Sequence, residues 1–370
     1  MSPERDAGAI ALAERMLALL DQGAFTATYK YAVLLGLLDL CLENTARTGA
    51  PPTSVTTRQL AGKVVELYWP HVVPHPIGAV LRQTTNRRAS IVTDIEAFRA
   101  AVEARTRHPL PLLGRARTVD PAGYERCVAR VEWTLIRYPL LLLQKVGGEE
   151  VRFLYEVGWD ASVSEAAVQR SQRGEVSSFA NAILLKPRVG EYLVQLNGLL
   201  RPLIHRQWAA KVARLNDLEE AKLEEFLFGA KRVALTAVRG PLLALQAGRC
   251  FYCGHAVSGT PEVDHFLPWS RYPDNALDNL VVADRACNND KRDFLAASAH
   301  VQAWVRRSRD GDGFAQLAAE LDWEYRPERS VSVARAIYLR LPADVRLWSA
   351  IGQFVRADPR AVASALAAAA

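Results

Sequence analysis

The sequence predicts a mainly α protein with small β elements, an α+β fold. Apolar residues recur at helical spacing over much of the chain, for example from Ile10 to Leu20 and from Tyr29 to Glu43. Runs that favour strands are few and short, and no internal repeat is present. With 370 residues, half of them hydrophobic, the chain can bury a substantial core divided among two or three domains.

Charge and composition indicate a protein that meets a polyanion inside the cell. The formal net charge is +6 and the pI is about 9.1, a mild bias toward nucleic acid. Charged residues interrupt the first twenty positions, so no signal-peptide pattern is present, and apolar runs such as Tyr31 to Leu38 are shorter than the roughly 18 residues of a membrane span. We expect a cytoplasmic protein without a membrane partner.

The N-terminal region, residues 1–118, is expected to be helical. Its helix order would suit a winged-helix-like nucleic-acid-binding module, with Ile77 to Leu81 as a further helix and Ile91 to Val92 in a wing, but an ordinary helical bundle explains the pattern equally well. A basic run in this region is a candidate for holding phosphates without reading sequence. Its arginines are Arg82, Arg87, Arg88, Arg99, Arg105, Arg107, Arg115 and Arg117.

Two further regions are expected to be mostly helical. Residues 119–248 are mixed and contain no spacing typical of a nucleotide loop or a nucleophile elbow. A short helix from Pro241 to Gln246 is predicted to lead into the segment that follows. In residues 299–370, short helices are predicted around Trp304, Leu317, Ala334 to Leu341 and Val345 to Val355.

Residues 249–298 carry most of the chemistry-bearing side chains. Cys250 and Cys253 have the spacing of metal ligands on a tight turn, and Cys287 adds a third thiolate. Strands are predicted at Glu262 to His265 and Leu280 to Ala283, and a helix from Arg285 onward. The other two cysteines of the chain, Cys41 and Cys127, lie in apolar helical stretches and are predicted core thiols.

The order Cys-x-x-Cys, Asp-His, Asn, Cys-Asn-x-x-Lys resembles the HNH nuclease finger. The resemblance covers about one eighth of the chain and implies a ββα-metal HNH finger flanked by helical regions of a larger, mostly helical bacterial protein. It implies His265 as the general base, Asn279 as the amide that fixes the loop carrying the base, and Asp264 and Asn288 as ligands of a catalytic Mg²⁺ or Mn²⁺. Lys291 and Arg292 are the expected phosphate contacts.

Three cysteines of the same finger point to a structural zinc ion, with an open fourth ligand. Family members that bind zinc have a second Cys-x-x-Cys pair, but here the position three before Cys287 is Asp284 and the position three after it is Asp290. Asp284 is the leading candidate, Asp290 and His255 are alternatives, and a finger without zinc is the remaining possibility.

The residues and the resemblance together predict a metal-dependent HNH endonuclease that hydrolyses phosphodiester bonds in DNA, with RNA as the less favoured substrate. The resemblance implies 3′-hydroxyl and 5′-phosphate ends. A nuclease of a mobile element and an RNA-cutting toxin are the alternatives within the same chemical class. Restriction or antiphage defence, with a defence-system partner protein, is the expected biological setting. The rival hypothesis is a non-catalytic, zinc-stapled nucleic-acid-binding or assembly module. The sequence gives no information on sequence preference or oligomeric state.

Overall fold

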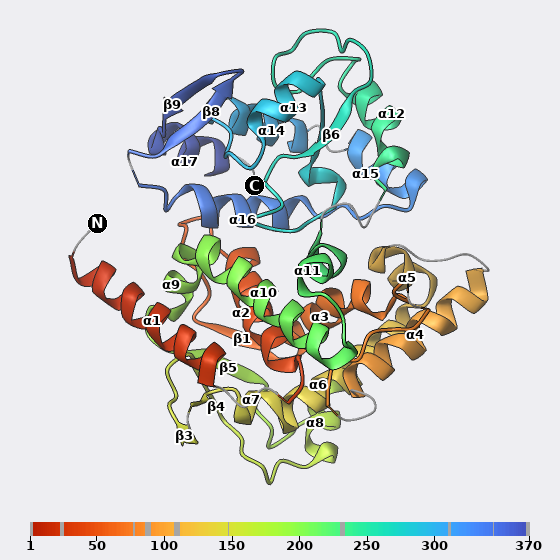
Figure 1. The fold of residues 1–370 in the computed structure, drawn as a ribbon, viewed down its shortest axis with the longest axis vertical. Coiled ribbons are helices and arrows are strands. Elements are labelled where there is room, and N and C mark those ends of the chain that lie inside the picture. Colours follow the sequence, from red (N-terminus) through yellow and green to blue (C-terminus); the bar gives the residue numbers. More distant parts are fainter. Residues whose placement is uncertain are drawn as a thin grey trace. The chain divides into compact units, whose positions relative to one another are not determined.

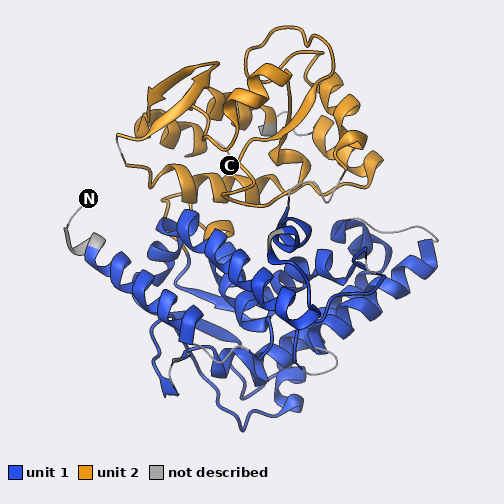
Figure 2. Ribbon diagram, in the orientation of Figure 1, with its two compact units in different colours: residues 1–41, 52–229 blue, residues 42–51, 230–370 orange. Residues whose placement is uncertain are grey.

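The computed structural model describes residues 3–22, 26–76, 78–85, 90–106, 112–146, 148–229, 234–309, 312–342 and 344–367. The chain divides into two compact units, and both are discontinuous (Figure 2). Unit 1 comprises Met1–Cys41 and Pro52–Gly229, and unit 2 comprises Leu42–Pro51 and Ala230–Ala370. About 58% of the protein is helical and 10% is in small sheets, which confirms the mainly α fold with small β elements.

Unit 1 is a helical body with two small sheets (Figure 1). Helix α2 continues from unit 1 into unit 2, and every side chain from Tyr31 to Leu42 is buried, as expected for a helix that is apolar on all sides. The helices are α1 (Pro3–Gln22), α2 (Tyr29–Glu43), α3 (Thr57–Tyr68), η1 (Trp69–Val72), α4 (Ser90–Thr106), α5 (Leu113–Val119), α6 (Pro121–Arg137), α7 (Pro139–Leu142), α8 (Glu165–Gln172), α9 (Val189–Gln195), α10 (Asn197–Asn216) and α11 (Glu220–Phe228).

The sheets of unit 1 connect distant parts of its sequence. β1 (Ser54–Thr56) and β4 (Tyr155–Val157) both pair antiparallel with the central β5 (Ala182–Leu185), while β2 (Lys145–Val146) and β3 (Glu149–Glu150) form a separate hairpin. β1 leads directly into α3, whose start is fixed by a capping box in which the side chains of Thr56 and Gln59 bond each other's backbone amides.

Two sequence-based expectations for the N-terminal region are wrong. Ile91 and Val92 lie in α4 with their side chains buried, so they form no wing strand. Residues 78–81 are not helical, and Ile77 lies outside the described residues. The reason is that the apolar periodicity of α4 begins at Ile91 itself and runs through Ile95, Phe98 and Val102, all of them buried.

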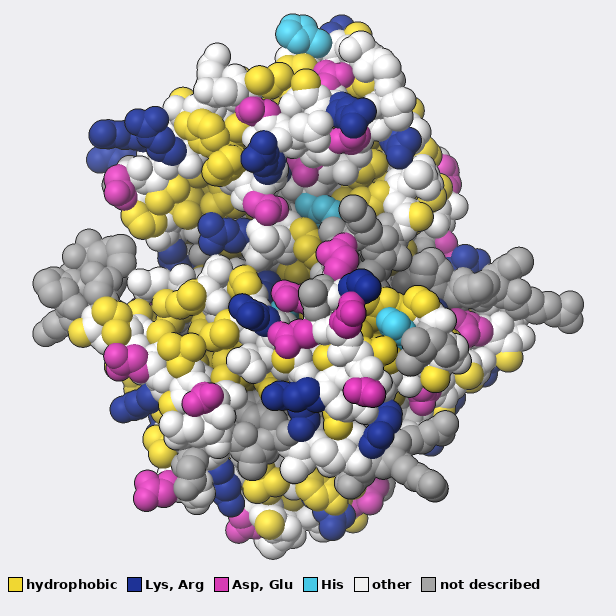
Figure 3. Space-filling view, viewed as in Figure 1, with side chains coloured by type: hydrophobic (Ala, Val, Ile, Leu, Met, Phe, Trp, Pro, Cys, Tyr) yellow, Lys and Arg dark blue, Asp and Glu magenta, His cyan; other side chains and the backbone are white. Residues whose placement is uncertain are grey.

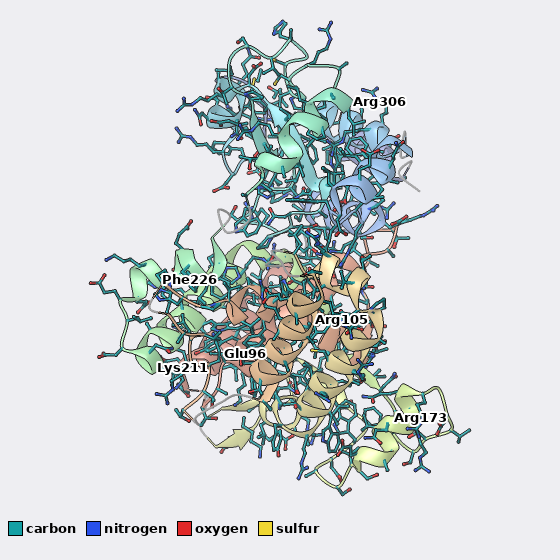
Figure 4. All side chains as sticks on the ribbon, turned by 90° about the vertical axis from the view of Figure 1, so that its right-hand side faces the viewer. Glu96, Arg105, Arg173, Lys211, Phe226 and Arg306 are labelled. Carbon is teal, nitrogen blue, oxygen red and sulfur yellow. The ribbon has the colours of Figure 1, made fainter. Side chains whose placement is uncertain are left out.

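The basic run of unit 1 is largely engaged in intramolecular contacts. Arg99 is 8% exposed and lies over the Trp69 ring, Arg105 pairs with Asp120, and Arg117 lies over Tyr124. Figure 4 labels Arg105 among the helices of this unit. Arg87, Arg88 and Arg107 lie outside the described residues.

Unit 2 surrounds the segment predicted to carry the chemistry. The elements are α12 (Thr236–Leu245), β6 (Glu262–His265), η3 (Leu277–Asn279), β7 (Leu280–Ala283), α13 (Arg285–Lys291), α14 (Ser298–Arg309), α15 (Asp312–Leu321), α16 (Pro327–Tyr338), β8 (Arg346–Ala350), β9 (Gln353–Arg356) and α17 (Pro359–Ala367). Its core includes a cluster in which side chains of α12 and α15 pack against η3 and β7. In the described part of the chain, no helix combines the length and apolar character required to cross a membrane.

Two elements of unit 2 differ from the sequence-based expectation. α12 begins at Thr236 and continues through Pro241, so the predicted helix start at Pro241 is wrong. Residues 346–356 form the β8–β9 hairpin and not a helix. The signal in the sequence is the turn at Gly352, whose φ of +68° favours glycine, between strands containing Leu347, Trp348, Phe354 and Val355.

Candidate functional site

The candidate site is built on two short antiparallel strands and one helix of unit 2. β6 and β7 pair with Asp264 opposite Val281 and His265 opposite Leu280, and α13 follows β7 directly. The observed bounds of both strands, and the start of α13 at Arg285, confirm the sequence-based prediction of a ββα unit. β7 is fully buried, which anchors the unit in the core.

Gln246 attaches this unit to the end of α12. Its side-chain amide donates to the Val282 carbonyl (2.8 Å) and accepts from the Val282 amide (2.8 Å), so a side chain occupies the edge of β7 like an additional strand residue. The Phe251 amide donates to the same carbonyl (3.0 Å). The segment from Cys250 to Gly254, which we name the cysteine turn, is therefore connected to β7 from the side of α12.

The cysteine turn brings four metal-ligand side chains together. Cys250, Cys253, Asp284 and Cys287 offer ligand atoms that all lie within 4.8 Å of one another. The turn is closed by the Gly254 amide, which donates to the Cys250 carbonyl (3.0 Å), and the φ of Gly254 is +72°. Three sulfur atoms and one carboxylate could hold a metal ion such as zinc.

The other two candidates for the fourth ligand lie outside this four-residue group. The Asp290 carboxylate accepts hydrogen bonds from Trp348 Nε1 (2.7 Å) and the Gly352 amide (2.8 Å) on the β8–β9 hairpin. His255 is exposed directly after the cysteine turn. Asp284 instead approaches Cys253 Sγ with its Oδ2 atom (3.4 Å), and burial raises the pKa of the Cys287 thiol beside it.

Asp264 lies on β6 between two partners that hold the same oxygen. Its Oδ2 atom accepts from the Tyr252 hydroxyl (2.5 Å) and lies 2.9 Å from the Lys291 ammonium. The Lys291 side chain is fully buried, and its ammonium also donates to the His265 carbonyl (3.1 Å). In this structure the Lys291 charge therefore faces Asp264, and contact with a phosphate would require the side chain to leave this position.

His265 is held from the loop that joins the two strands. Its Nε2 atom lies 2.8 Å from Asn275 Oδ1, and its ring lies against the Trp269 ring at a centroid distance of 5.1 Å. Because the amide oxygen can only accept, the imidazole must donate from Nε2, which leaves Nδ1 as the acceptor nitrogen of the neutral ring. Burial lowers the pKa of His265, so the neutral form is favoured.

Asn279 bonds the loop at two points. The buried amide accepts from the Leu267 backbone N–H (2.8 Å) and donates to the carbonyls of Leu267 (3.3 Å) and Asp274 (3.1 Å). Leu267 lies two residues before Trp269 and Asp274 directly precedes Asn275, the two residues that contact His265, so a single side chain limits how far either end of the loop can move.

Asn288 lies on α13 and faces the first residue of β6. Its Nδ2 atom donates to Glu262 Oε2 (2.7 Å), which leaves its Oδ1 atom as an oxygen ligand. Glu262 also lies 3.6 Å from the Arg285 guanidinium. Arg292, just beyond α13, is exposed and donates from Nε to the Asn289 carbonyl (3.1 Å).

Asp274 and Asp278 form a buried acidic pair near the end of the loop that joins β6 and β7. Asp274 and Asp278 are 5% and 1% exposed, and each has one carboxylate oxygen without a hydrogen bond in the described part of the chain. Asp278 Oδ1 accepts from the Arg326 amide (2.7 Å), and Arg329 approaches Asp274 at 3.6 Å. Burial, followed by repulsion from Asp274, raises the pKa of Asp278 to about 6.

Three residues of this site were not predicted from the sequence: Tyr252, Glu262 and Asn275. Tyr252 and Glu262 had readable signals, since one lies inside the Cys-x-x-Cys turn and the other lies two residues before Asp264 on the same strand face. Asn275 had no comparable signal, because its approach to His265 depends on the path of the nine intervening loop residues.

Comparison with known families agrees with this geometry. Residues 250–297 match the family described as HNH endonuclease. This segment is an HNH domain. No curated protein and no solved structure matches the chain. The HNH domain thus occupies about one eighth of a larger helical protein, and the match supports nuclease activity on a nucleic-acid substrate at the level of the family.

Proposed function

We propose that this protein is a metal-dependent endonuclease that hydrolyses phosphodiester bonds in DNA. The observation that carries the proposal is the arrangement around β6. His265, whose Nδ1 atom has no hydrogen-bond partner among the described residues, directly follows Asp264 on β6. Asn288 of α13 bonds Glu262 at the start of the same strand, and all of these residues lie in a segment that matches the HNH endonuclease family. Hydrolysis of a phosphodiester needs a base for the attacking water and positive charge near the leaving oxygen.

His265 acts as the base. The bond to Asn275 holds the proton on Nε2, so Nδ1 can take the proton of a water molecule that attacks the phosphorus atom. Asn279 keeps the loop in place at Leu267 and Asp274, and through the loop it orients the imidazole. Asn279 is therefore a positioning residue in this proposal, and His265 is the residue that moves the proton.

Asp264 and Asn288 are the residues that would hold a catalytic Mg²⁺ or Mn²⁺ ion. Both offer hard oxygen ligands, and in the described part of the chain neither Asp264 Oδ1 nor Asn288 Oδ1 has a hydrogen-bond donor. The chemistry of these two oxygen ligands supports the proposed divalent ion. When bound, such an ion stabilises the negative charge that develops on the leaving oxygen. Tyr252 and Lys291 hold the other oxygen of Asp264 and orient the carboxylate.

Cys250, Cys253, Asp284 and Cys287 would hold a structural zinc ion. Three thiolates and the Asp284 carboxylate would supply the four ligands that a structural zinc ion takes, with no ligand position left for substrate. Cys250 is 2% exposed and Cys287 is 4% exposed, so the site is closed on two sides. The zinc would link the turn before β6 to the start of α13 and thereby stabilise the domain.

Restriction or antiphage defence is the biological role that we propose for this nuclease. The HNH domain lies in a larger helical protein whose sequence motifs supply no further catalytic groups. The helical remainder would then select the substrate or receive the activating signal. A defence-system partner protein would provide such a signal.

A second candidate function is a non-catalytic, zinc-stapled module that binds nucleic acid. The specific observation in its favour is the buried Lys291 ammonium, which already neutralises the carboxylate of Asp264. This hypothesis predicts that the protein binds nucleic acid but does not cleave it, whichever divalent ion is added.

Cleavage of supercoiled plasmid by the full chain distinguishes the two functions. The assay is run with Mg²⁺, with Mn²⁺, without added divalent ions and with EDTA, beside a labelled RNA of matched length. We expect nicking that requires Mg²⁺ or Mn²⁺ and disappears in His265→Ala. The matched control is His255→Ala, because His255 is exposed and lies outside the four-ligand group. Equal nicking by wild type and a folded His265→Ala protein would remove His265 from the mechanism.

A further inference from the structure

The β8–β9 hairpin presents two arginines directly opposite each other. Arg346 pairs with Arg356 and Trp348 pairs with Phe354 in the antiparallel register. Alternate residues of a strand share one face, so the two arginines lie on the same face as Trp348 and Phe354. Figure 3 shows Lys and Arg side chains gathered at the upper left, on the side of unit 2 where Figure 1 places β8 and β9.

This face of the hairpin is fixed to the helix that carries Asn288. Asp290, on α13, accepts from Trp348 Nε1 (2.7 Å) and from the Gly352 amide in the hairpin turn (2.8 Å). Beyond the helix, Phe294 packs edge-on against Phe354 with a centroid distance of 4.9 Å. The hairpin therefore contacts residues on both sides of Arg292, which directly follows the last residue of α13.

Arg292, Arg346 and Arg356 form a set of exposed guanidinium groups that we name the hairpin arginines. Within the described residues none of the three has an ion-pair partner, in contrast to Arg99 and Arg105 of unit 1. Like charges directly opposite each other destabilise an antiparallel pair, so the Arg346–Arg356 pairing costs free energy unless an anion binds there.

Two acids in the segments that adjoin the hairpin are engaged elsewhere. Asp290 is bound to the hairpin turn, and the Asp358 carboxylate caps α17 by accepting from the amides of Arg360 (3.1 Å) and Ala361 (3.0 Å). Exposed guanidinium groups that have no ion-pair partner among the described residues favour a ligand whose oxygens can take two N–H donors at once, as phosphate does.

We propose that the hairpin arginines bind backbone phosphates of the nucleic-acid substrate, adjacent to the end of α13. The inference rests on the proposed function, since the substrate is the one that the HNH domain would cut. Nucleic acid fits better than an acidic protein because the hairpin is anchored to the helix that supplies Asn288. A backbone held there would lie beside the residues proposed to act on it.

Binding is tested in the full chain carrying His265→Ala, so that cleavage does not interfere, and without added divalent ions. The affinity for a fluorescent DNA duplex is measured by anisotropy over a series of salt concentrations. For Arg346→Ala/Arg356→Ala we expect the slope of log affinity against log salt to fall by about 2, since each phosphate contact contributes about 0.9. Arg346→Lys/Arg356→Lys should restore most of the slope, and melting curves check that each variant is folded.

The control is Arg126→Ala/Arg306→Ala, which removes the same charge from two other exposed arginines, on α6 and α14. Figure 4 labels Arg306 in unit 2. An unchanged slope in the hairpin variant overturns the proposal, as does an equal fall in the control. Polyglutamate that competes with the duplex only when the hairpin arginines are present would assign the surface to an acidic protein instead. Because the readout is binding, the result is independent of whether the wild type cleaves plasmid.

Discussion

His265 Nε2 and Asn275 Oδ1 lie 2.8 Å apart, although Asn275 is ten positions further along the chain. Asn275 is held in turn, since its carbonyl accepts from Trp323 Nε1 (2.7 Å). The contact therefore sets both the tautomer and the direction of the imidazole from a fixed point, and it decides which nitrogen can receive a proton.

Asn275→Ala is expected to lower the rate of cleavage by roughly 10- to 100-fold, because the imidazole loses its orientation and the Nε2 tautomer. Affinity for the DNA duplex should stay within a factor of about two, since the side chain is not proposed to contact phosphate. Single-turnover cleavage and anisotropy separate the two effects. Asn275→Asp, which keeps an acceptor oxygen at this position, should recover a large part of the rate. A rate for Asn275→Ala equal to wild type would show that His265 needs no such support.

The fourth zinc ligand can be tested by exchange. Gently purified wild type should contain about one zinc ion per chain, Asp284→Ala should contain much less, and Asp284→Cys should keep its zinc because a fourth thiolate completes a common structural set. Metal analysis with melting curves provides the measurement. Asp290→Ala serves as the control, since it releases the hairpin without touching the ligand group. Full zinc content in Asp284→Ala would exclude Asp284 as a ligand.

Asp278 should make stability depend on pH. Its pKa in the folded protein is raised to about 6, so the folded state holds a proton that the unfolded state releases at lower pH. The stabilisation is present below the unfolded pKa and is lost as the pH rises through about 6. Asp278→Asn keeps an oxygen for the Arg326 amide and removes the titration.

Denaturant unfolding of both proteins between about pH 5 and pH 8 measures this effect. The Asn variant should gain stability relative to wild type as the pH rises, with the largest difference above about pH 7. Parallel profiles for the two proteins would show that Asp278 titrates normally.

Arg292 occupies a backbone conformation that favours glycine, with φ of 47° and ψ of −129° at the end of α13. Such a conformation costs a non-glycine residue about 1 kcal/mol or more, so Arg292→Gly should raise the melting temperature by a few degrees. The same variant should bind the DNA duplex more weakly, because one of the hairpin arginines is lost. Arg292→Ala removes the charge but keeps a non-glycine residue in the strained conformation. Equal melting temperatures of Arg292→Ala and Arg292→Gly would argue against strain at this position.

The two strands and the helix of the HNH domain could be predicted because short stretches of adjacent residues determine each of them. The strands at Glu262–His265 and Leu280–Ala283 and the start of α13 follow from a few adjacent residues each. The approach of Asp284 to the three cysteines is partly local too, since it lies three residues before Cys287 on the turn into the same helix.

The remaining features depend on long-range packing, which the pattern of the sequence does not show. Lys291 has the helical position of a phosphate contact, but the burial of α13 against β6 turns its ammonium toward Asp264. The segment from Val345 to Val355 was expected to be helical, yet its hairpin is held by Asp290, more than fifty residues earlier. The basic run of unit 1 was interpreted by charge alone, and aromatic partners for Arg99 and Arg117 became visible only in the fold.

Unit 2 includes residues 42–51, which precede most of unit 1 in the sequence. Glu43 accepts from the Tyr272 hydroxyl (2.5 Å) and lies 3.5 Å from Arg329, and both partners belong to the loop support of the HNH domain. A gene fragment that begins at residue 230 would leave this half-buried arginine without one of its carboxylates. Unit 2, which contains the HNH domain, is thus not encoded by one continuous stretch of the gene. Recombination that moves this unit into another protein would have to carry a second, distant piece of coding sequence.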